Sequence, residues 1–268
     1  MKKILLSLGM IVVMGAGVAM GTGAFFSDTE TSTGNTFTAG AIDLKVDSEQ
    51  HYNGNVCVNG LWAGSAPYPV EGTACDGTWL PTDLGVQKFF NFGDLKPGDE
   101  GENTLSFHVT SNDAWLKAGV GDISDLDGSC TEPEEESADT CTMLLPDVDP
   151  GDGELAESMM FRAWVDDGVT DGWDGSSDLE EGDNIYQSNE VLVAGGDANG
   201  WMTLSALDSA LAATPAWGMT PINPFYLGME WKLDGATTGN AVQTDSLGFP
   251  LMFEVQQMRN NSTPSFGI

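Results

Sequence analysis

The chain has 268 residues and a formal net charge of −32 at pH 7, with 41 acidic residues against nine lysines and arginines. This charge excludes nucleic acid as a partner, because binding to phosphates requires basic side chains that displace counterions. The acidity indicates a salty medium, which screens self-repulsion, or abundant divalent cations. An ordinary acidic secreted protein is an equal alternative.

The first predicted element is an export signal over residues 1–24. Lys2 and Lys3 supply a positive start, Ile4–Met20 form an uncharged apolar core, and small residues up to Ala24 supply a cleavage site. The alternative is a retained membrane anchor, because the apolar run is long enough to cross a bilayer. Cleavage is favoured, so we expect a secreted protein, extracellular or at the cell surface. It would meet signal peptidase during export and keep no stable membrane anchor.

A polar, threonine-rich arm follows over residues 25–38. Its threonines favour extended backbone, yet the arm has no hydrophobic stripe that would let it fold alone. A disordered tail is the alternative interpretation.

Regular alternation of apolar and polar residues predicts β-strands in four segments: Ala41–Val46, Leu105–Thr110, Phe225–Leu233 and Leu247–Val255. Such alternation is typical of antiparallel strands with one face on a core and one in water. Because Pro250 cannot donate a backbone hydrogen bond, the last strand is expected to be an edge strand or to carry a bulge.

One helix is predicted, in the stretch TLSALDSALAA at residues 203–213, where leucines recur at helical spacing before Pro215. Short strands, long polar loops and little helix predict an all-β fold, an antiparallel β-sandwich in one domain over residues 39–268. Stretches rich in aspartate and glycine at about 47–85 and 122–184 are interpreted as long loop insertions. A turn is predicted at Lys96–Asp99.

The four cysteines allow three disulfide pairings. An exported chain lives where disulfides persist, and Cys57–Cys75 and Cys130–Cys141 each close a short local loop. These two bridges are predicted. A zinc site built from all four cysteines is the alternative, although the chain contains no CxxC motif.

Two acidic segments are candidate calcium loops. Calcium binds six to eight oxygen ligands, and glycine-punctuated loops can wrap around it, although neither segment matches the EF-hand pattern. Solvated turns are the alternative. The candidate ligands are Asp147, Asp149, Asp152 and Glu154 in the first segment and Asp166, Asp167, Asp171 and Asp174 in the second.

Catalytic motifs are scarce. The two histidines, His51 in a predicted loop and His108 on a predicted strand, lack the HExxH spacing of zinc proteases, and no GxSxG elbow occurs. Paired carboxylates for glycoside hydrolysis stay possible in so acidic a chain. Trp62, Trp79 and Trp173 lie in predicted loops, where they could contact carbohydrate or another subunit, whereas Trp231 is predicted to be core.

Several segments resemble the exported biofilm fibre proteins of the TasA and camelysin type, including their acidic archaeal members. The resemblance lies in the aromatic-Ser-Asp start, the F-x-A-G-x-x-D-L motif, the L-K-P-G-D turn, the approach to the closing strand and the final residues. These correspond to Phe26–Asp28, Phe37–Leu44, Leu95–Asp99, Gly239–Ser246 and Gln256–Asn261. The central insertions depart from the bacterial pattern.

The resemblance implies a jelly-roll-like sandwich whose subunits polymerise head to tail by donor-strand complementation. The freed arm of one subunit would add a strand to the next, with main-chain hydrogen bonds completing an edge. A head-to-tail contact does not close on itself, so it yields a filament. The expected donor-strand residues are Phe25, Phe26, Thr29, Thr31, Thr33 and Phe37.

We therefore expect a secreted, non-enzymatic structural subunit of an extracellular filament, such as a biofilm matrix fibre or a pilus-like fibre, with itself as partner. One alternative is a monomeric surface protein that binds calcium or carbohydrate. Another is a metallo-endopeptidase, the activity attributed to the camelysin branch. Asn260 and Asn261 begin glycosylation sequons.

Overall fold

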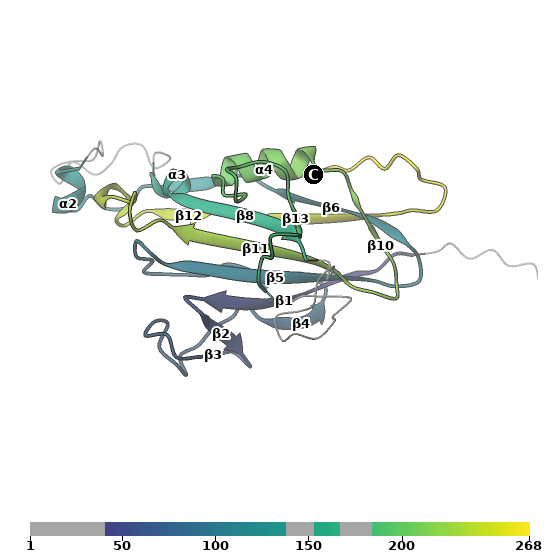
Figure 1. Ribbon diagram of the computed structural model, residues 1–268, viewed down its shortest axis with the longest axis horizontal. Coiled ribbons are helices and arrows are strands. Elements are labelled where there is room, and N and C mark those ends of the chain that lie inside the picture. The colour runs from purple at the N-terminus through teal and green to yellow at the C-terminus, as the bar shows by residue number, and fades with distance from the viewer. Residues whose placement is uncertain (1–40, 138–152, 167–183) are drawn as a thin grey trace, which may run out of the picture. The chain divides into compact units, whose positions relative to one another are not determined.

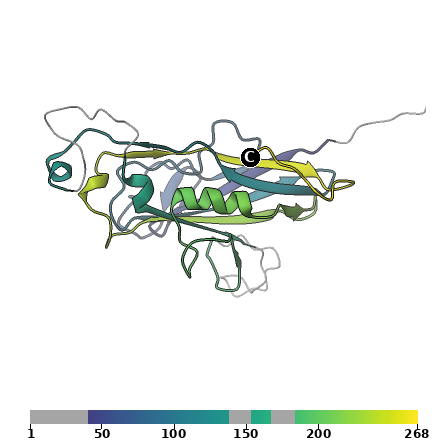
Figure 2. The ribbon, with the colours of Figure 1, turned by 90° about the horizontal axis from the view of Figure 1, so that it is seen from above.

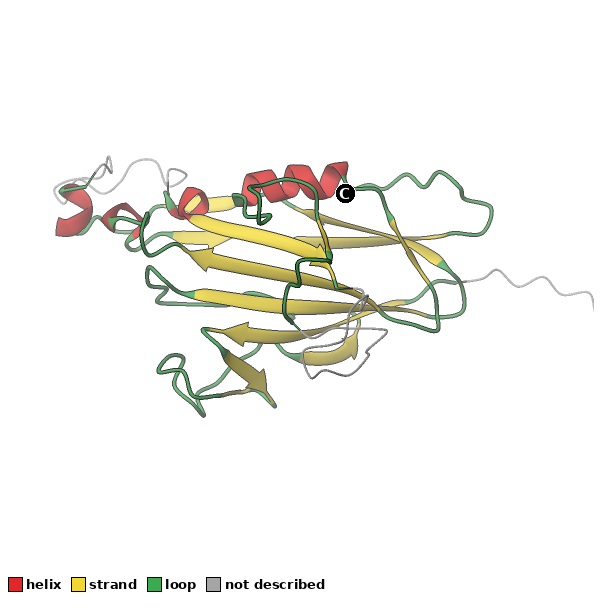
Figure 3. Ribbon diagram, viewed as in Figure 1, coloured by secondary structure: helices red, strands yellow, loops and turns green. Residues whose placement is uncertain are grey.

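The alternating segments form an antiparallel β-sandwich, which Figure 1 shows as a computed structural model. The structure describes residues 41–137, 153–166 and 184–268, which belong to one compact unit, Gly40–Ile268. Every strand pairing in this described part is antiparallel, and strands far outnumber helices (Figure 3). The predicted all-β sandwich with little helix is confirmed.

The larger sheet has β1, β5, β11 and β8 at its centre. Its strands, in spatial order, are β3 (Leu61–Ala63), β2 (Asn55–Val58), β1 (Leu44–Tyr52), β5 (Glu100–Val109), β11 (Phe225–Leu233), β8 (Met159–Val165) and β9 (Val191–Leu192), with β4 (Trp79–Thr82) paired to β1. Successive side chains of a strand point to opposite faces. Leu105 and Leu227, directly opposite in register, both point to the core and are fully buried.

The second layer faces the core side of this sheet. It contains a three-stranded sheet in the order β10 (Trp217–Met219), β6 (Ala114–Val120) and β13 (Leu251–Gln257), and a two-stranded ribbon of β12 (Ser246–Gly248) and β7 (Ser124–Leu126). Aromatic rings join the layers: the ring centroids of Phe107 on β5 and Phe253 on β13 lie 4.8 Å apart. Edge-to-face pairs of this kind stabilise a core beyond the area they bury.

Helix α4 (Leu204–Ala213) contacts β6 and β8 and runs along the strands when seen from above (Figure 2). The Thr203 hydroxyl caps its start by accepting a hydrogen bond from the Ala206 N–H, and Pro215 follows its end, so the predicted helix is confirmed. The described part otherwise contains only the single turns α2 (Glu132–Glu135) and α3 (Leu155–Ser158) and the 3-10 turn η1 (Asn240–Val242).

Two strands have other bounds in the structure than the sequence predicted. The segment at Leu247–Val255 is divided by Phe249 and Pro250 into β12 and β13, which belong to different sheets. The missing N–H of Pro250 explains the break, and β13 lies at the edge of its sheet, as the proline predicted. β1 continues to Tyr52, well beyond the predicted end at Val46, because the alternation persists with the polar Ser48 and Gln50 on the buried face.

The two predicted insertions also contain regular structure, which corrects their interpretation as loops. The segment at 47–85 supplies β2, β3 and β4, and the segment at 122–184 contains β8, a central strand whose Phe161 and Ala163 are buried. The strong aspartate and glycine content around β8 concealed its alternation.

The cysteines and tryptophans are placed as follows. The predicted Cys57–Cys75 bridge is present and ties β2 to the loop after β3. Cys141 lies outside the described residues, so the Cys130–Cys141 bridge stays a prediction. Trp231 is buried as expected, whereas Trp62 and Trp79 lie on β3 and β4 rather than in loops. Trp173 falls outside the described residues.

The turn at Lys96–Asp99 forms as predicted, with the Asp99 N–H donating to the Lys96 carbonyl over 2.9 Å. Asp99 then accepts a hydrogen bond from the buried Tyr52 hydroxyl at 2.8 Å. Burial and this bond raise the pKa of Tyr52 well above its ordinary value. Across the parts of the chain that the structure describes, no helix is both long and apolar enough to span a membrane.

Candidate functional site

A long apolar groove of about 1240 Å³ opens on the core side of the larger sheet. One wall is the segment Leu84–Pro97, which contains no strand, and the other is the run Gly239–Leu251. The floor is made by residues at the end of β11 and the start of β8, among them Trp231 and Phe161. The groove therefore enters the interior of the sandwich.

The walls carry apolar side chains that are only partly buried, beside polar ones such as Lys88, Asn91 and Gln243. A closed sandwich would bury the apolar ones, since burying apolar area stabilises by about 25 cal/mol per Å². Here they leave apolar surface available to another segment of chain. The partly buried wall residues that pack against the core are Phe90, Phe92, Leu95, Val242, Leu247, Phe249 and Leu251.

Strand edges next to the groove lack partners. Within the described residues, β12 pairs only with β7 and β13 pairs only with β6, so each strand keeps one edge with no strand beside it. All of β12 and the first residue of β13, Leu251, line the groove. The described part of the chain also has no backbone hydrogen bond between the two walls. Unpaired edges of this kind accept an added strand.

The part of the groove at Trp231 lies at the far end of the larger sheet from the chain entry, whereas the part at Leu84 follows Thr82, which pairs with Val46 near that entry. The chain enters at Leu44, which is paired with Val109, and runs to Tyr52, which is paired with Gly101 (Figure 1). Trp231, on the groove floor, is also paired with Gly101. The eight steps along β1 correspond to roughly 27 Å. An arm that leaves before β1 therefore starts at the far end from this part of the groove.

The donor-strand residues predicted from the resemblance cannot be placed against this groove. Phe25, Phe26, Thr29, Thr31, Thr33 and Phe37 all lie outside the described residues.

A second feature is a cluster of carboxylates near the ribbon of β7 and β12. Oxygens of Asp127, Glu134 and Asp245 lie within 4.8 Å of one another, and Glu134 is fully buried. Asp127 follows β7, Glu134 lies on α2, and Asp245 precedes β12. Three segments distant in sequence thus bring negative oxygens together.

Backbone hydrogen bonds hold Asp245 of this cluster and the neighbouring Asp125 in place. The Glu154 N–H donates to Asp245 Oδ2 over 2.8 Å, and the Ala156 N–H donates to Asp125 Oδ2 over 3.0 Å. Burial raises the pKa of Asp125, and nearby Glu157 raises it further, although the Ala156 bond opposes both. The segments 124–137, 153–158 and 240–248 contain no lysine or arginine that could balance this charge.

The predicted calcium ligands are divided between two places. Glu154 lies at this cluster, through its N–H bond to Asp245, whereas Asp166 is buried at the end of β8, with its N–H donating to the Tyr226 carbonyl over 3.2 Å. The structure therefore does not unite these two residues in one site. Asp147, Asp149, Asp152, Asp167, Asp171 and Asp174 lie outside the described residues.

Asp127, Glu134 and Asp245 were not predicted as ligands from the sequence. They come from three separate segments, and nothing in the local spacing distinguishes them from the many other acidic residues of the chain. The one available signal was the T-x-x-E pattern at Thr131–Glu134, which the structure shows as a capping box with Glu134 reaching back to the Thr131 N–H.

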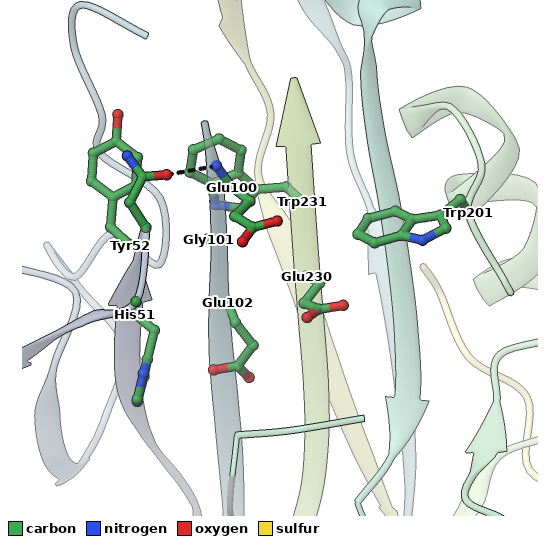
Figure 4. Close-up of a pocket in the computed structure, with 10 residues that line it drawn as sticks. His51, Tyr52, Glu100, Gly101, Glu102, Trp201, Glu230 and Trp231 are labelled. Atoms are coloured by element: carbon green, nitrogen blue, oxygen red, sulfur yellow. Dashed lines mark hydrogen bonds between the residues drawn. The ribbon is translucent and has the colours of Figure 1, made fainter. Parts of the chain in front are cut away.

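A third feature is a small polar pocket of about 120 Å³ on the outer face of the larger sheet (Figure 4). Glu102 on β5 and Glu230 on β11 are directly opposite in register, and both extend into this region. His51 flanks Glu102 from β1, and Trp201 approaches from the opposite side. The sequence analysis assigned none of these residues to a pocket, and it placed His51 in a loop, whereas His51 lies within β1.

Glu102 is 5% exposed, and its Oε2 atom is buried without a hydrogen-bond partner. Burial raises the pKa of Glu102 well above its ordinary value. The bond from the Thr104 hydroxyl lowers it, and the carboxylates of Glu230, Asp166 and Glu49 raise it again. This environment disfavours the ionised form of Glu102, so a bound proton or a bound cation would stabilise it.

The histidines do not assemble a protease site among the described residues. His51 lies 3.2 Å from a Glu49 oxygen, and His108 lies 3.3 Å from an Asp47 oxygen, in separate pairs on the same face of the sheet. The carboxylate cluster of Asp127, Glu134 and Asp245 contains no histidine. The described geometry therefore lends no support to zinc-dependent proteolysis.

A scan against protein-family models and a search of curated proteins both find no match for the chain.

Proposed function

We propose that the protein is a secreted structural subunit that polymerises head to tail into an extracellular filament, each subunit inserting its arm into the groove of the next. The observation that carries the proposal is the apolar groove bordered by unpaired strand edges. The arm, residues 25–38, is the occupant. Camelysin-like proteolysis has no comparable observation in its favour.

The arm has the length and chemistry for this role. Fourteen residues in extended conformation span roughly 45 Å, enough to follow the groove and its edges. Phe25, Phe26 and Phe37 supply apolar groups, and the threonines between them favour strand geometry. Main-chain hydrogen bonds to β12 or β13 would hold the arm, and its aromatic side chains would fill the space between the walls.

We assign the acceptor groove to a neighbouring subunit because the resemblance implies that the arm is exchanged head to tail. A neighbour placed end to end receives the arm directly. Such a contact joins different surfaces of the two subunits, so it propagates as a filament rather than closing as a dimer.

A free arm peptide tests the proposal on the mature chain, Phe25–Ile268. We expect a synthetic peptide of residues 25–38 to bind the last groove of each filament and to shorten filaments in proportion to its concentration. Negative-stain length distributions provide the measurement. A peptide with Phe37→Asp is the matched control, because it keeps the length but places a charge on an apolar anchor.

Unchanged lengths with the native peptide would contradict the assignment of the arm to the groove. If the mature chain forms no filaments at all, the alternative of a monomeric surface protein is favoured instead.

We also propose that the cluster of Asp127, Glu134 and Asp245 binds calcium. The specific observation is the convergence of three carboxylates, one of them fully buried, in segments that lack any basic residue. Buried carboxylates of this kind are normally paired or coordinate a metal. Oxygen ligands from flexible loops suit calcium better than smaller ions.

Chelation tests this calcium site. We expect EGTA to lower the stability of the protein by about 2–3 kcal/mol if calcium was present at roughly a hundred times its dissociation constant. Thermal denaturation with and without calcium provides the measurement. The double variant Asp127→Asn, Asp245→Asn should lose the calcium response, whereas Glu71→Gln, at an exposed position, should keep it. An equal response in both variants would remove the cluster as the site.

A further inference from the structure

We infer that the outer-face pocket between Glu102 and Glu230 binds a divalent cation that keeps part of its water shell, as Mg²⁺ does. This site opens on the outer face of the larger sheet, shares only Trp231 with the lining of the groove, and does not depend on filament formation. Its residues come from β1, β5, β11 and the segment that carries Trp201.

The first argument is the unpartnered oxygen. Glu102 is 5% exposed, and its Oε2 has no hydrogen-bond donor, while Oε1 accepts only the Thr104 hydroxyl at 2.8 Å. A buried carboxyl group without a donor is costly unless a proton or a cation compensates it. Glu102 lines the pocket, so a cation entering there can reach the free oxygen.

The second argument is that Glu102 itself has no protein cation as its partner. In the described residues, no lysine, arginine or histidine forms an ion pair with Glu102. Arg162 pairs with Glu230, and Lys232 lies 4.2 Å from the Trp201 ring centroid. Residues 167–183 contain no lysine or arginine in sequence. Of the pocket carboxyl groups, Glu230 is therefore balanced by Arg162, whereas Glu102 and Glu100 have no ion pair among the described residues.

The third argument decides the type of cation. The pocket holds about 120 Å³, which is room for an ion and several waters. The described residues do not bring three potential ligands within 4.8 Å of one another here, as they do at Asp127, Glu134 and Asp245. A fully caged calcium ion is thus a poorer fit than Mg²⁺, which is commonly bound through one or two carboxylates and retains waters.

A carbohydrate is the rival ligand, because two opposed glutamates beside a tryptophan also occur in sugar-binding sites. Here Arg162 lies 4.8 Å and Lys232 lies 4.2 Å from the Trp201 ring centroid. Both cations lie over this ring, where a sugar would have to stack. The small volume of the pocket argues against a sugar as well.

Mn²⁺, a paramagnetic ion that replaces Mg²⁺, provides the probe. The chain has only two histidines, and His51 lies beside Glu102 while His108 is six residues along β5, roughly 20 Å away. In mature protein labelled at histidine, we expect Mn²⁺ to broaden the His51 ring signals at concentrations that leave His108 sharp. Magic-angle-spinning spectra serve for monomers and filaments alike. Adding Mg²⁺ should reverse the broadening.

Glu102→Gln is the decisive variant, since it keeps the shape and removes the ligand charge. We expect it to raise the Mn²⁺ concentration needed at His51 about tenfold or more, with Glu230→Gln as a second variant should the first not fold. Glu71→Gln is the control and should behave as the native chain. Equal broadening of both histidines, or His51 broadening that survives both variants, would overturn the site. If glucose or cellobiose shifts the His51 signals and Mn²⁺ leaves them unchanged, the carbohydrate is favoured instead.

Discussion

Filaments are expected from the mature chain, Phe25–Ile268, and none from a chain that begins at Thr38. The shorter chain keeps every described strand and the whole groove but lacks the segment proposed to fill it. Each junction would lose both the backbone pairing along the arm and the apolar burial of its phenylalanines, which contribute about 1.5–3 kcal/mol apiece when fully buried. Negative-stain electron microscopy of both purified proteins checks the result.

Loss of filaments is also expected when the groove, rather than the arm, is altered. Leu247→Asp places a charge on the apolar wall, at a residue of β12 that lies directly in the groove. We expect it to abolish filaments while leaving the circular dichroism spectrum unchanged. Ile222→Asp is the matched control, because Ile222 is 89% exposed and lies outside the groove lining, and it should form filaments normally.

The two halves of this experiment can be combined. A chain that has an intact arm but carries Leu247→Asp should still cap native filaments, because its donor segment is unaltered. A chain that begins at Thr38 should accept an arm but extend no further. Filaments formed by either variant alone would mean that another surface drives assembly.

Replacing Lys117 by methionine is expected to destabilise the domain by about 3–4 kcal/mol. Lys117 is 8% exposed on β6, and its ammonium group donates hydrogen bonds to the carbonyls of Leu211, Ala212 and Thr214. These carbonyls belong to the end of α4, where backbone acceptors have no helical partner and the helix dipole is negative. Hydrogen bonds to a charged donor contribute about 1.5–3 kcal/mol each, with partial solvent access reducing the sum.

Burial lowers the pKa of Lys117, which shows that the group is partly desolvated and that its acceptors must compensate it. Methionine keeps the length of the side chain but removes the ammonium donor from all three carbonyls, of which Leu211 alone keeps a hydrogen bond, from the Thr214 N–H over 3.2 Å. Guanidinium denaturation of chains that begin at Thr38 measures the change free of filament formation. Lys45→Met is the control, since Lys45 is partly exposed and its ion pairs at 3.6 and 3.9 Å should contribute less than about 1 kcal/mol. Equal midpoints for the two variants would show that Lys117 does not anchor α4.

Local sequence patterns determined the class of fold. Alternation along Phe225–Leu233, helical spacing before Pro215 and the turn at Lys96–Asp99 all depend on neighbours close in the chain, and each formed as predicted. The missing N–H of Pro250 likewise predicted an edge strand, which β13 is, because that property belongs to the residue itself. The pairing of Cys57 with Cys75 followed from a short loop that few other partners could close.

Alternation did not reveal β8 or the second half of β1, because the surrounding composition concealed it. β8 lies among aspartates and glycines and ends in the Trp164–Val165 pair, so its alternation is short, although it becomes a central strand. The buried Ser48 and Gln50 made the second half of β1 appear polar. Gln50 is tolerated inside because its side-chain amide donates to the Phe89 carbonyl over 2.8 Å, a contact across 39 residues that no local window contains.

The candidate sites belong almost wholly to tertiary structure. The sequence by itself established an acidic chain and predicted its export and an arm unable to fold alone, since charge, hydropathy and a lack of periodicity are sums over residues. Only the fold brought Asp127, Glu134 and Asp245 together, set Glu102 opposite Glu230, and left a groove between Leu84–Pro97 and Gly239–Leu251. These arrangements arise from strand register and from the packing of two sheets, which join residues far apart in the chain and therefore leave no local trace.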